Sequence, residues 1–268
     1  MMETAITAGI DVGTRNTKVA LLEDGKRILT MKDYPTGYDF GKAAEQALHG
    51  SLDSLGLGRK DVSYVAATGF GRYRVDFRDI NVTDITANGK GAKFLYPNTT
   101  CVLDVGAGNA RASKVNENGK VIKFRSTEKC AAGGGGFLEK ISFYTGVKLS
   151  ELGEVSLKAL NPVNMSTVCS VLAESEVINL VTQEVPMEDI LMGAHNSVAG
   201  RVSLTLKQVG LESEITLTGG LVLNPAFIKA LEEKIHMKVN ASSRLLYAGA
   251  LGAAYLGYKR LEKKTQAG

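Results

Sequence analysis

Apolar runs with tight turns between them open each half of the chain. Asp24-Gly25 and Asn118-Gly119 are two-residue hairpin signals, since both central residues of such a turn favour positive φ. Each half is therefore expected to begin with a three-stranded β-meander. The six predicted strands cover residues 5–12, 16–23, 27–32, 100–106, 110–116 and 120–126.

The two meanders also share a sequence. Residues 11–26 read DVGTRNTKVALLEDGK, and residues 104–120 read DVGAGNARASKVNENGK. The shared order of an Asp-Val-Gly, an asparagine, a basic residue and a hairpin turn predicts a duplicated unit. The matched residues are Asp11, Val12, Gly13, Asn16 and Lys18 with Asp104, Val105, Gly106, Asn109 and Arg111.

Apolar positions spaced three and four residues apart predict helices after each meander. The predicted helices cover 39–56, 84–95, 133–145, 167–182, 188–209, 224–235 and 246–262, with short strands at 61–67 and 214–218. The repeated order βββαβα predicts an α/β protein of two lobes, 1–98 and 99–268, with a cleft between them. We expect the last helix to pack back onto the first lobe.

Composition excludes several classes of protein. Apolar residues make up 44% of the chain and charged residues 22%, which excludes a disordered chain. No run approaches the ~20 apolar residues of a membrane span, and the N-terminus lacks a secretory pattern. The net charge is only +4, and its one cluster, at 259–264, is interpreted as a solvated helix face. We therefore expect neither nucleic acid nor a membrane as partner.

Three cysteines without a CxxC pair indicate reduced thiols and a cytoplasmic protein.

The two loops that begin with Asp11-Val12-Gly13 and Asp104-Val105-Gly106, here called the Asp-Gly loops, suggest a nucleotide site. The carboxylates of Asp11 and Asp104 could hold a hydrated Mg²⁺, while the amides of the residues that follow cradle phosphate oxygens. One copy alone is more simply a hairpin corner, but two copies and a Thr218-Gly219-Gly220 after a strand favour a nucleotide. Neither a Walker A motif nor a dinucleotide fingerprint is present. The candidate nucleotide-binding residues in these loops are Gly13, Thr14, Lys18, Gly106, Gly219 and Gly220.

These loops resemble those of the sugar kinase, heat-shock-70 and actin superfamily, which has a ribonuclease-H-like, actin/hexokinase-type fold. Asp11–Lys18 would be the first phosphate loop, Asp104–Arg111 the second, and Gly219-Gly220 the adenosine loop. Within that superfamily the chain is similar to the activator ATPases of 2-hydroxyacyl-CoA dehydratases and the ATPase subunits of benzoyl-CoA reductases. The stretches that carry this resemblance are Thr68–Arg72, Lys129–Gly133, Cys169–Val177, Ser197–Arg201, Thr218–Gly220 and Tyr247–Ala253. The resemblance adds Gly133 and Gly134 to the nucleotide contacts.

The cysteines have two interpretations. Cys130 follows a lysine ahead of a predicted helix and Cys169 lies in a first helical turn, where thiolates are favoured. Their spacing alone favours buried, apolar thiols, but the resemblance places both on the family's [4Fe-4S] ligands. Two thiolates are half of the four that such a cluster needs, so a cluster shared by two chains is implied. Cys101, inside an apolar strand, is expected in the core.

The resemblance implies ATP-driven electron delivery. ATP and Mg²⁺ would bind between the lobes, shift the cysteine-bearing segments and let the cluster pass an electron to the iron–sulfur subunits of a CoA-ester reductase or dehydratase. A ferredoxin or similar electron donor would then reduce the cluster again.

Departures from the family pattern refine this expectation. The activators usually carry Asp-Ile-Gly-Gly-Gln-Asp where residues 104–109 read DVGAGN, and a histidine where Asn88 stands. Lys129–Gly133 is also followed by Gly-Gly-Gly-Phe instead of Thr-Gly-Arg-Phe. These differences resemble the smaller ATPase subunit of benzoyl-CoA reductase and predict a heterodimer with a larger homologous subunit, in which this chain hydrolyses ATP slowly alone.

Three alternatives stay open. The chain could be a homodimeric dehydratase activator. It could be a sugar or acyl kinase, with Asp76, Asp79 or Asp84 as the base, or a scaffold that senses nucleotide without turnover. Arg72 and Arg111 are candidates for contact with nucleotide or partner.

Overall fold

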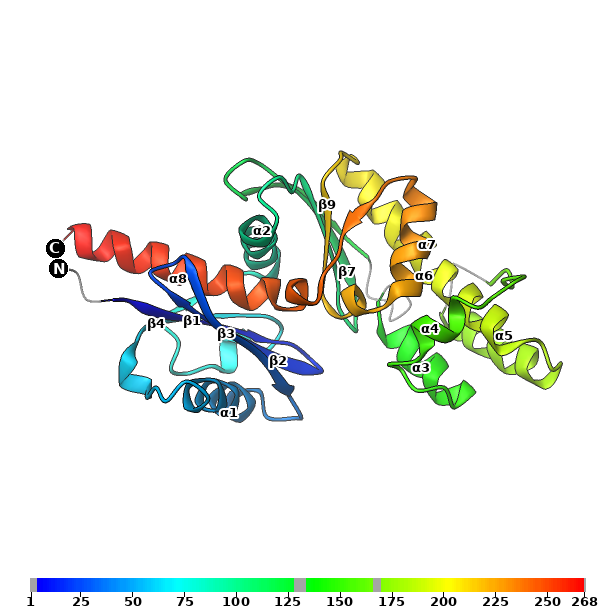
Figure 1. Ribbon diagram of the computed structural model, residues 1–268, viewed down its shortest axis with the longest axis horizontal. Helices are drawn as coiled ribbons and strands as arrows, with labels where there is room; N and C mark the ends of the chain where they lie inside the picture. The colour runs from blue at the N-terminus through cyan, green and yellow to red at the C-terminus, as the bar shows by residue number, and fades with distance from the viewer. Residues whose placement is uncertain (1–3, 128–133, 166–169, 268) are drawn as a thin grey trace. The chain divides into compact units, whose positions relative to one another are not determined.

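The computed structural model describes residues 4–127, 134–165 and 170–267. The chain folds into two compact units. The N-terminal unit contains residues 1–98, 115–121 and 244–268, and the C-terminal unit contains residues 99–114 and 122–243. The last helix thus belongs to the N-terminal unit although its sequence follows the C-terminal one (Figure 1).

A five-stranded mixed sheet forms the centre of the N-terminal unit. Its strand order is β3-β2-β1-β4-β5, with β1 antiparallel to β2 and parallel to β4. Asp24 and Gly25 both have positive φ, as the hairpin signal between β2 and β3 predicts. The strands are β1 (Ile6–Val12), β2 (Asn16–Glu23), β3 (Arg27–Pro35), β4 (Val62–Thr68) and β5 (Ile80–Asn81).

Helices cover both faces of this sheet. α1 (Phe40–Asp53) packs on one face, and α2 (Asp84–Leu95) and α8 (Ala248–Ala267) pack together on the other (Figure 1). α8 lies so close to β1 and α2 that only glycine fits at three contacts, those of Gly9, Gly91 and Gly252. A Cβ on Gly9 would lie 1.9 Å from the Ala250 carbonyl oxygen, and one on Gly252 would lie 1.8 Å from that of Ala87. This tight packing fixes the start of α8 against the end of β1.

The C-terminal unit repeats the arrangement with more helices. Its sheet has the order β10-β9-β6-β7-β8, and the long helix α6 contacts α3, α4, α5 and α7. No helix in the described ranges of either unit is long and apolar enough to span a membrane. The elements are β6 (Cys101–Val105), β7 (Ala110–Val115), β8 (Val121–Ser126), α3 (Gly136–Thr145), α4 (Leu152–Ser156), α5 (Ser170–Thr182), α6 (Met187–Val209), β9 (Ile215–Thr218), α7 (Pro225–Ile235) and β10 (Val239–Asn240).

The structure corrects the sequence predictions at three points. The short elements β5, α4 and β10 were not predicted, and α3 begins at Gly136, later than the predicted 133. At the second hairpin only Gly119 has positive φ. There the Asn116 side chain accepts hydrogen bonds from the amides of Asn118 and Lys120, and this side-chain contact shapes a different turn.

A buried histidine gives the C-terminal unit a dependence on pH. His195 Nδ1 lies 2.8 Å from the Leu191 carbonyl oxygen, and its Nε2 accepts a hydrogen bond from Asn224 Nδ2 at 2.9 Å. Burial lowers the pKa of His195 from 6.5 to about 4, so the ring is neutral in the folded protein.

We expect this histidine to make the fold acid-labile. The unfolded chain binds a proton near pH 6.5 and the folded chain only near pH 4, so stability is full above pH 6.5 and falls by about 3 kcal/mol towards pH 4. The free energy of unfolding, measured with urea at several pH values across this range, should change much less with pH in His195→Asn than in the wild type, whatever the stability of the variant at pH 7. His49→Gln, at an exposed histidine, is the matched control. A His195→Asn protein whose unfolding free energy changes with pH as steeply as that of the wild type would show that His195 does not cause the acid lability.

Candidate functional site

The first Asp-Gly loop (Asp11–Lys18) links β1 to β2. The Gly13 amide donates to the Asn16 carbonyl oxygen at 3.2 Å and closes a tight turn, on which Thr14 is exposed. Asp11 and Lys18 pair directly across β1 and β2, so their side chains share one face of the sheet. A carboxylate and an ammonium thus project from the same strand ends.

Two glycines enclose the Asp11 carboxylate. A Cβ on Gly69 would lie 2.4 Å from Asp11 Oδ1, and one on Gly249 would lie 2.7 Å from Oδ2. Gly249 belongs to the first turn of α8, where unpaired backbone N–H groups favour negative charge. Two backbone positions without side chains thus leave room for the Asp11 carboxylate at the end of β1, and a carboxylate is a ligand type that fits a hydrated Mg²⁺.

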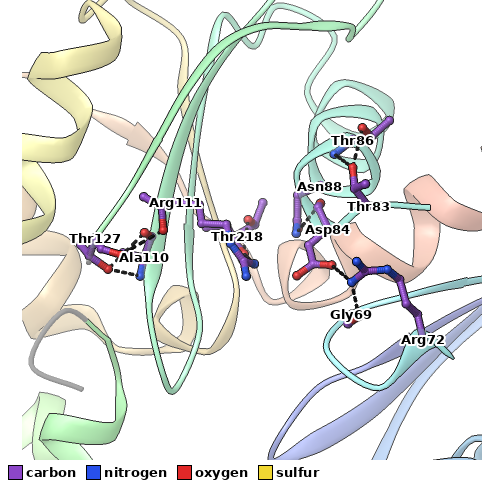
Figure 2. Close-up of polar contacts among 12 residues, drawn as sticks. Gly69, Arg72, Thr83, Asp84, Thr86, Asn88, Ala110, Arg111, Thr127 and Thr218 are labelled. Atoms are coloured by element: carbon purple, nitrogen blue, oxygen red, sulfur yellow. Dashed lines mark hydrogen bonds and ion pairs between the residues drawn. The ribbon is translucent and has the colours of Figure 1, made fainter. Parts of the chain in front are cut away.

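The second Asp-Gly loop (Asp104–Arg111) repeats this geometry between β6 and β7. The Gly106 amide donates to the Asn109 carbonyl oxygen at 3.0 Å. Asp104 Oδ1 accepts a hydrogen bond from Thr218 Oγ1 at 3.1 Å, and its Oδ2 lies 3.8 Å from Arg111 Nη1. Figure 2 shows Arg111 and Thr218. Arg111, a candidate for nucleotide or partner contact, is an ion-pair partner of the loop carboxylate.

The duplication extends further than the sequence comparison indicated. Asp11 is in register with Thr68 on β4, and Asp104 is in register with Thr218 on β9. In each unit the threonine is followed by a glycine with left-handed φ, +87° at Gly69 and +86° at Gly219. Both glycines pack on the carboxylate and on the carbonyl oxygen that follows it. An aspartate, a basic residue and a Thr-Gly pair thus form the repeated unit. The sequence comparison matched the first two between the halves and named both Thr-Gly pairs, but it did not show that these pairs are equivalent.

Gly219 is expected to tolerate no side chain. Its φ of 86° and ψ of −174° are accessible to glycine almost alone, and a Cβ would lie 2.4 Å from the Val105 carbonyl oxygen. Gly219→Ala should lower the free energy of unfolding by about 3 kcal/mol. Gly146→Ala, with a φ of 70° and open space around it, should cost about 1 kcal/mol. Equal losses in urea unfolding would contradict the role of this contact. Gly220, the next residue, has open space beside it.

The glycine run before α3 packs on the second loop. The Gly135 amide donates to the Gly106 carbonyl oxygen at 2.9 Å, and the Gly136 amide donates to that of Ala107 at 2.8 Å. A Cβ on Gly134 would lie 2.6 Å from the Gly106 carbonyl oxygen. These contacts explain both the run of glycines and the late start of α3. Gly133, Cys130 and Cys169 lie outside the described residues.

The segment that contains Cys130 is anchored at both flanks to this loop. Before it, the Thr127 amide donates to the Ala110 carbonyl oxygen at 2.9 Å, and the Ala110 amide donates to Thr127 Oγ1 at 3.0 Å (Figure 2). After it come the bonds of Gly135 and Gly136 to Gly106 and Ala107. Thr127 before residues 128–133, and Gly135 and Gly136 after them, thus all bond to the second loop.

The remaining candidates have structural partners. Arg72 donates to the Gly69 carbonyl oxygen at 2.8 Å and pairs with Asp84 at 3.1 Å, and so ties the first turn of α2 to the loop beside Asp11 (Figure 2). Asp79 accepts a hydrogen bond from the Val65 amide at 2.7 Å, and Asp76 and Asp79 are both exposed.

Two further side chains are buried. Asn88, where the family has a histidine, donates to the Asp84 carbonyl oxygen at 3.1 Å. Cys101 is fully buried in β6, as expected. Within the described ranges no group of three or more histidine, cysteine or acidic side chains could hold a metal ion.

Comparison with known proteins places this geometry in a family. A benzoyl-CoA reductase subunit from Thauera aromatica is 40% identical over 98% of this chain and 96% of its own length. The structure of the activator of 2-hydroxyisocaproyl-CoA dehydratase from Clostridium difficile, with bound ADPNP, matches with a TM-score of 0.93 and 30% identity over 98% of both chains.

A more distant match supports the fold alone. A ROK family glucokinase from Streptomyces griseus matches with a TM-score of 0.63 at 14% identity, over 95% of this chain and 100% of its own. The two mixed sheets with their helices have the actin/hexokinase-like α/β fold. Residues 8–257 match the BadF/BadG/BcrA/BcrD ATPase family, and the chain belongs to this family.

Proposed function

We propose that the chain is an ATP-driven electron-delivery subunit of a CoA-ester reductase of the benzoyl-CoA reductase type. Its relative at 40% identity is named as a subunit of that enzyme, and the match spans nearly the whole of both chains. In this proposal ATP hydrolysis by the repeated Asp-Gly site drives an electron to the iron–sulfur subunits of the reductase. A ferredoxin or similar donor resupplies it, and the partner in the dimer is a larger homologous ATPase subunit.

The two Asp-Gly loops would have different roles in nucleotide binding. Asp11, beside the start of α8, would hold the hydrated Mg²⁺ that accompanies the phosphates, with Lys18 on the same sheet face as a phosphate contact. Asp104, fixed by Thr218 and Arg111, would orient the second loop, whose Gly106 amide closes the turn. The backbone of Gly219 and Gly220 would lie close to the nucleoside, because these residues have no side chain to prevent the approach.

Cys130 and Cys169 would supply two thiolates to a [4Fe-4S] cluster shared between two chains, and that cluster supplies one-electron transfer when bound. The observation that carries the proposal is the anchoring of both flanks of residues 128–133 to the second Asp-Gly loop. A nucleotide that moves this loop would therefore also move Cys130.

Electron paramagnetic resonance of the reduced chain tests this coupling. With Mg²⁺ present, we expect different spectra with ATP and with ADP, and a smaller difference in Thr127→Val, which loses the side-chain bond to Ala110. Thr145→Val, at the far end of α3, is the matched control because its hydroxyl bonds only within its own helix region. Identical spectra with both nucleotides in the wild-type protein would contradict the proposal.

Slow hydrolysis by the isolated chain follows from the tip of the second loop. Gly108 is exposed and a Cβ there would meet no atom within 4 Å, so the backbone leaves open space where the glutamine of the family pattern would begin. The double variant Gly108→Gln/Asn109→Asp should raise ATP turnover by about tenfold, since the new carboxylate can orient a water molecule. Phosphate release is the assay and Gly108→Ala/Asn109→Ala the control. No gain over that control would show that the loop tip does not limit the rate.

A homodimeric activator of a 2-hydroxyacyl-CoA dehydratase is the second candidate. The structural match to such an activator, with a TM-score of 0.93, favours it. The two functions differ in ATP consumption, because a reductase subunit must deliver electrons in every turnover and an activator only at the start. Counting ATP hydrolysed per CoA-ester product in the reconstituted system separates them. A constant ratio supports the reductase, and a ratio that falls as product accumulates supports the activator.

A further inference from the structure

Thr68, the last residue of β4, has a buried hydroxyl without a hydrogen-bond partner. The residue is 1% exposed, and within the described part of the chain its Oγ1 is the single buried side-chain oxygen or nitrogen that lacks a partner. An unpaired buried hydroxyl destabilises a fold, whereas valine has the same shape without this cost. A group outside the protein is therefore the natural partner of this hydroxyl.

The hydroxyl lies on the same face of the sheet as the Asp11 side chain, on the neighbouring strand. Thr68 and Asp11 are register neighbours on the parallel strands β4 and β1, so their side chains lie on the same face of the sheet. That face is the one that α2 and α8 cover, since Ala66, two residues earlier on β4, packs with Ala87 and Ala253. The Asp11 carboxylate lies against the first turn of α8 at Gly249.

The equivalent position in the C-terminal unit shows what a threonine there can reach. Thr218 is in register with Asp104, and its Oγ1 donates to Asp104 Oδ1 at 3.1 Å. The duplication thus places a hydroxyl next to each loop carboxylate. In the C-terminal unit the protein itself engages the hydroxyl, whereas in the N-terminal unit it does not.

We propose that Thr68 is a positioning residue for the divalent cation, and that its Oγ1 hydrogen-bonds a water molecule in the coordination shell of the Mg²⁺ that accompanies the nucleotide at Asp11. A water bound to a divalent cation is a strong hydrogen-bond donor, and a threonine hydroxyl can accept from it while it donates to a carboxylate. This inference rests on the proposed nucleotide site.

Calorimetric titration of the full chain with ADP, at a series of Mg²⁺ concentrations and in EDTA, tests the role of Thr68. In Thr68→Val we expect the Mg²⁺ concentration for half-maximal ADP affinity to rise about tenfold, as for the loss of one hydrogen bond. Binding in EDTA should be unchanged and the Tm of the nucleotide-free protein should not fall. Thr68→Ser should restore the wild-type Mg²⁺ requirement.

Thr7→Val is the matched control on the same sheet. Thr7 is also fully buried, but its Oγ1 donates to the Ala254 carbonyl oxygen at 3.1 Å. This variant should lower the Tm and leave the Mg²⁺ requirement unchanged.

The outcomes separate this inference from the proposed function. A Thr68→Val protein with a lower Tm and a wild-type Mg²⁺ requirement would show that the hydroxyl is structural, and would overturn the inference alone. A wild-type chain that binds ADP without any dependence on Mg²⁺, or not at all, would overturn the proposed function together with it.

Discussion

Asp11→Asn is expected to slow ATP turnover by about 10²–10³-fold while the protein stays folded. The substitution keeps the shape that Gly69 and Gly249 enclose and removes only the charge. Without that charge the strand end cannot hold the Mg²⁺ of the nucleotide, and the first turn of α8 loses the anion that it favours. Phosphate release by the chain together with its dimer partner is the measurement.

Asp53→Asn, at the exposed end of α1, is the matched control and should keep full turnover. An Asp11→Asn protein with the Tm of the wild type and more than about a tenth of its turnover would exclude Asp11 from the catalytic site. Asp104→Asn is expected to lose turnover too, and also stability, because it weakens the ion pair with Arg111.

Cys130→Ala is expected to abolish ATP-dependent electron delivery and to leave ADP binding within a factor of about two of the wild type. Alanine cannot ligate iron, whereas the backbone contacts that hold the flanks of the segment to the second loop do not depend on the thiol. Reduction of the CoA-ester by the reconstituted reductase reports electron delivery, and calorimetry reports ADP binding. Cys169→Ala should behave in the same way.

Cys101→Ala provides the control for the cysteines. Cys101 is fully buried in β6, and its Sγ lies 3.5 Å from the Gly210 carbonyl oxygen. The variant should lose some stability and keep electron delivery. Delivery that survives in Cys130→Ala would contradict the assignment of this cysteine to the cluster.

Local sequence signals predicted most of the fold. The apolar runs of β1 and β2 and the turn at Asp24-Gly25 are determined by neighbouring residues, so the first meander lies close to its predicted position. β5, α4 and β10 are too short to show a periodicity, and their positions depend on packing against other elements. α3 begins late because Gly134 and Gly135 are used for contact with the second loop.

The site was predictable only as far as it is continuous in sequence. The two Asp-Gly loops are short and duplicated, so comparison of the halves found Asp11 and Asp104. The equivalence of Thr68 with Thr218 was hidden, because the four helices α3 to α6 precede β9 in the second unit, whereas the single α-helix α1 separates β3 from β4 in the first. Only the parallel pairing of β4 with β1 and of β9 with β6 brings each threonine to its aspartate.

Iron and acid-labile sulfide, counted per chain in protein purified without oxygen, test whether the chain is a nucleotide-driven iron–sulfur protein. We expect about two irons and two sulfides per chain, retained in Cys101→Ala and lost in Cys130→Ala, because one [4Fe-4S] cluster is shared by two chains. Protein expressed together with its larger homologous subunit should give the same count. A chain without iron in both preparations, or one whose iron survives in Cys130→Ala, would contradict the account.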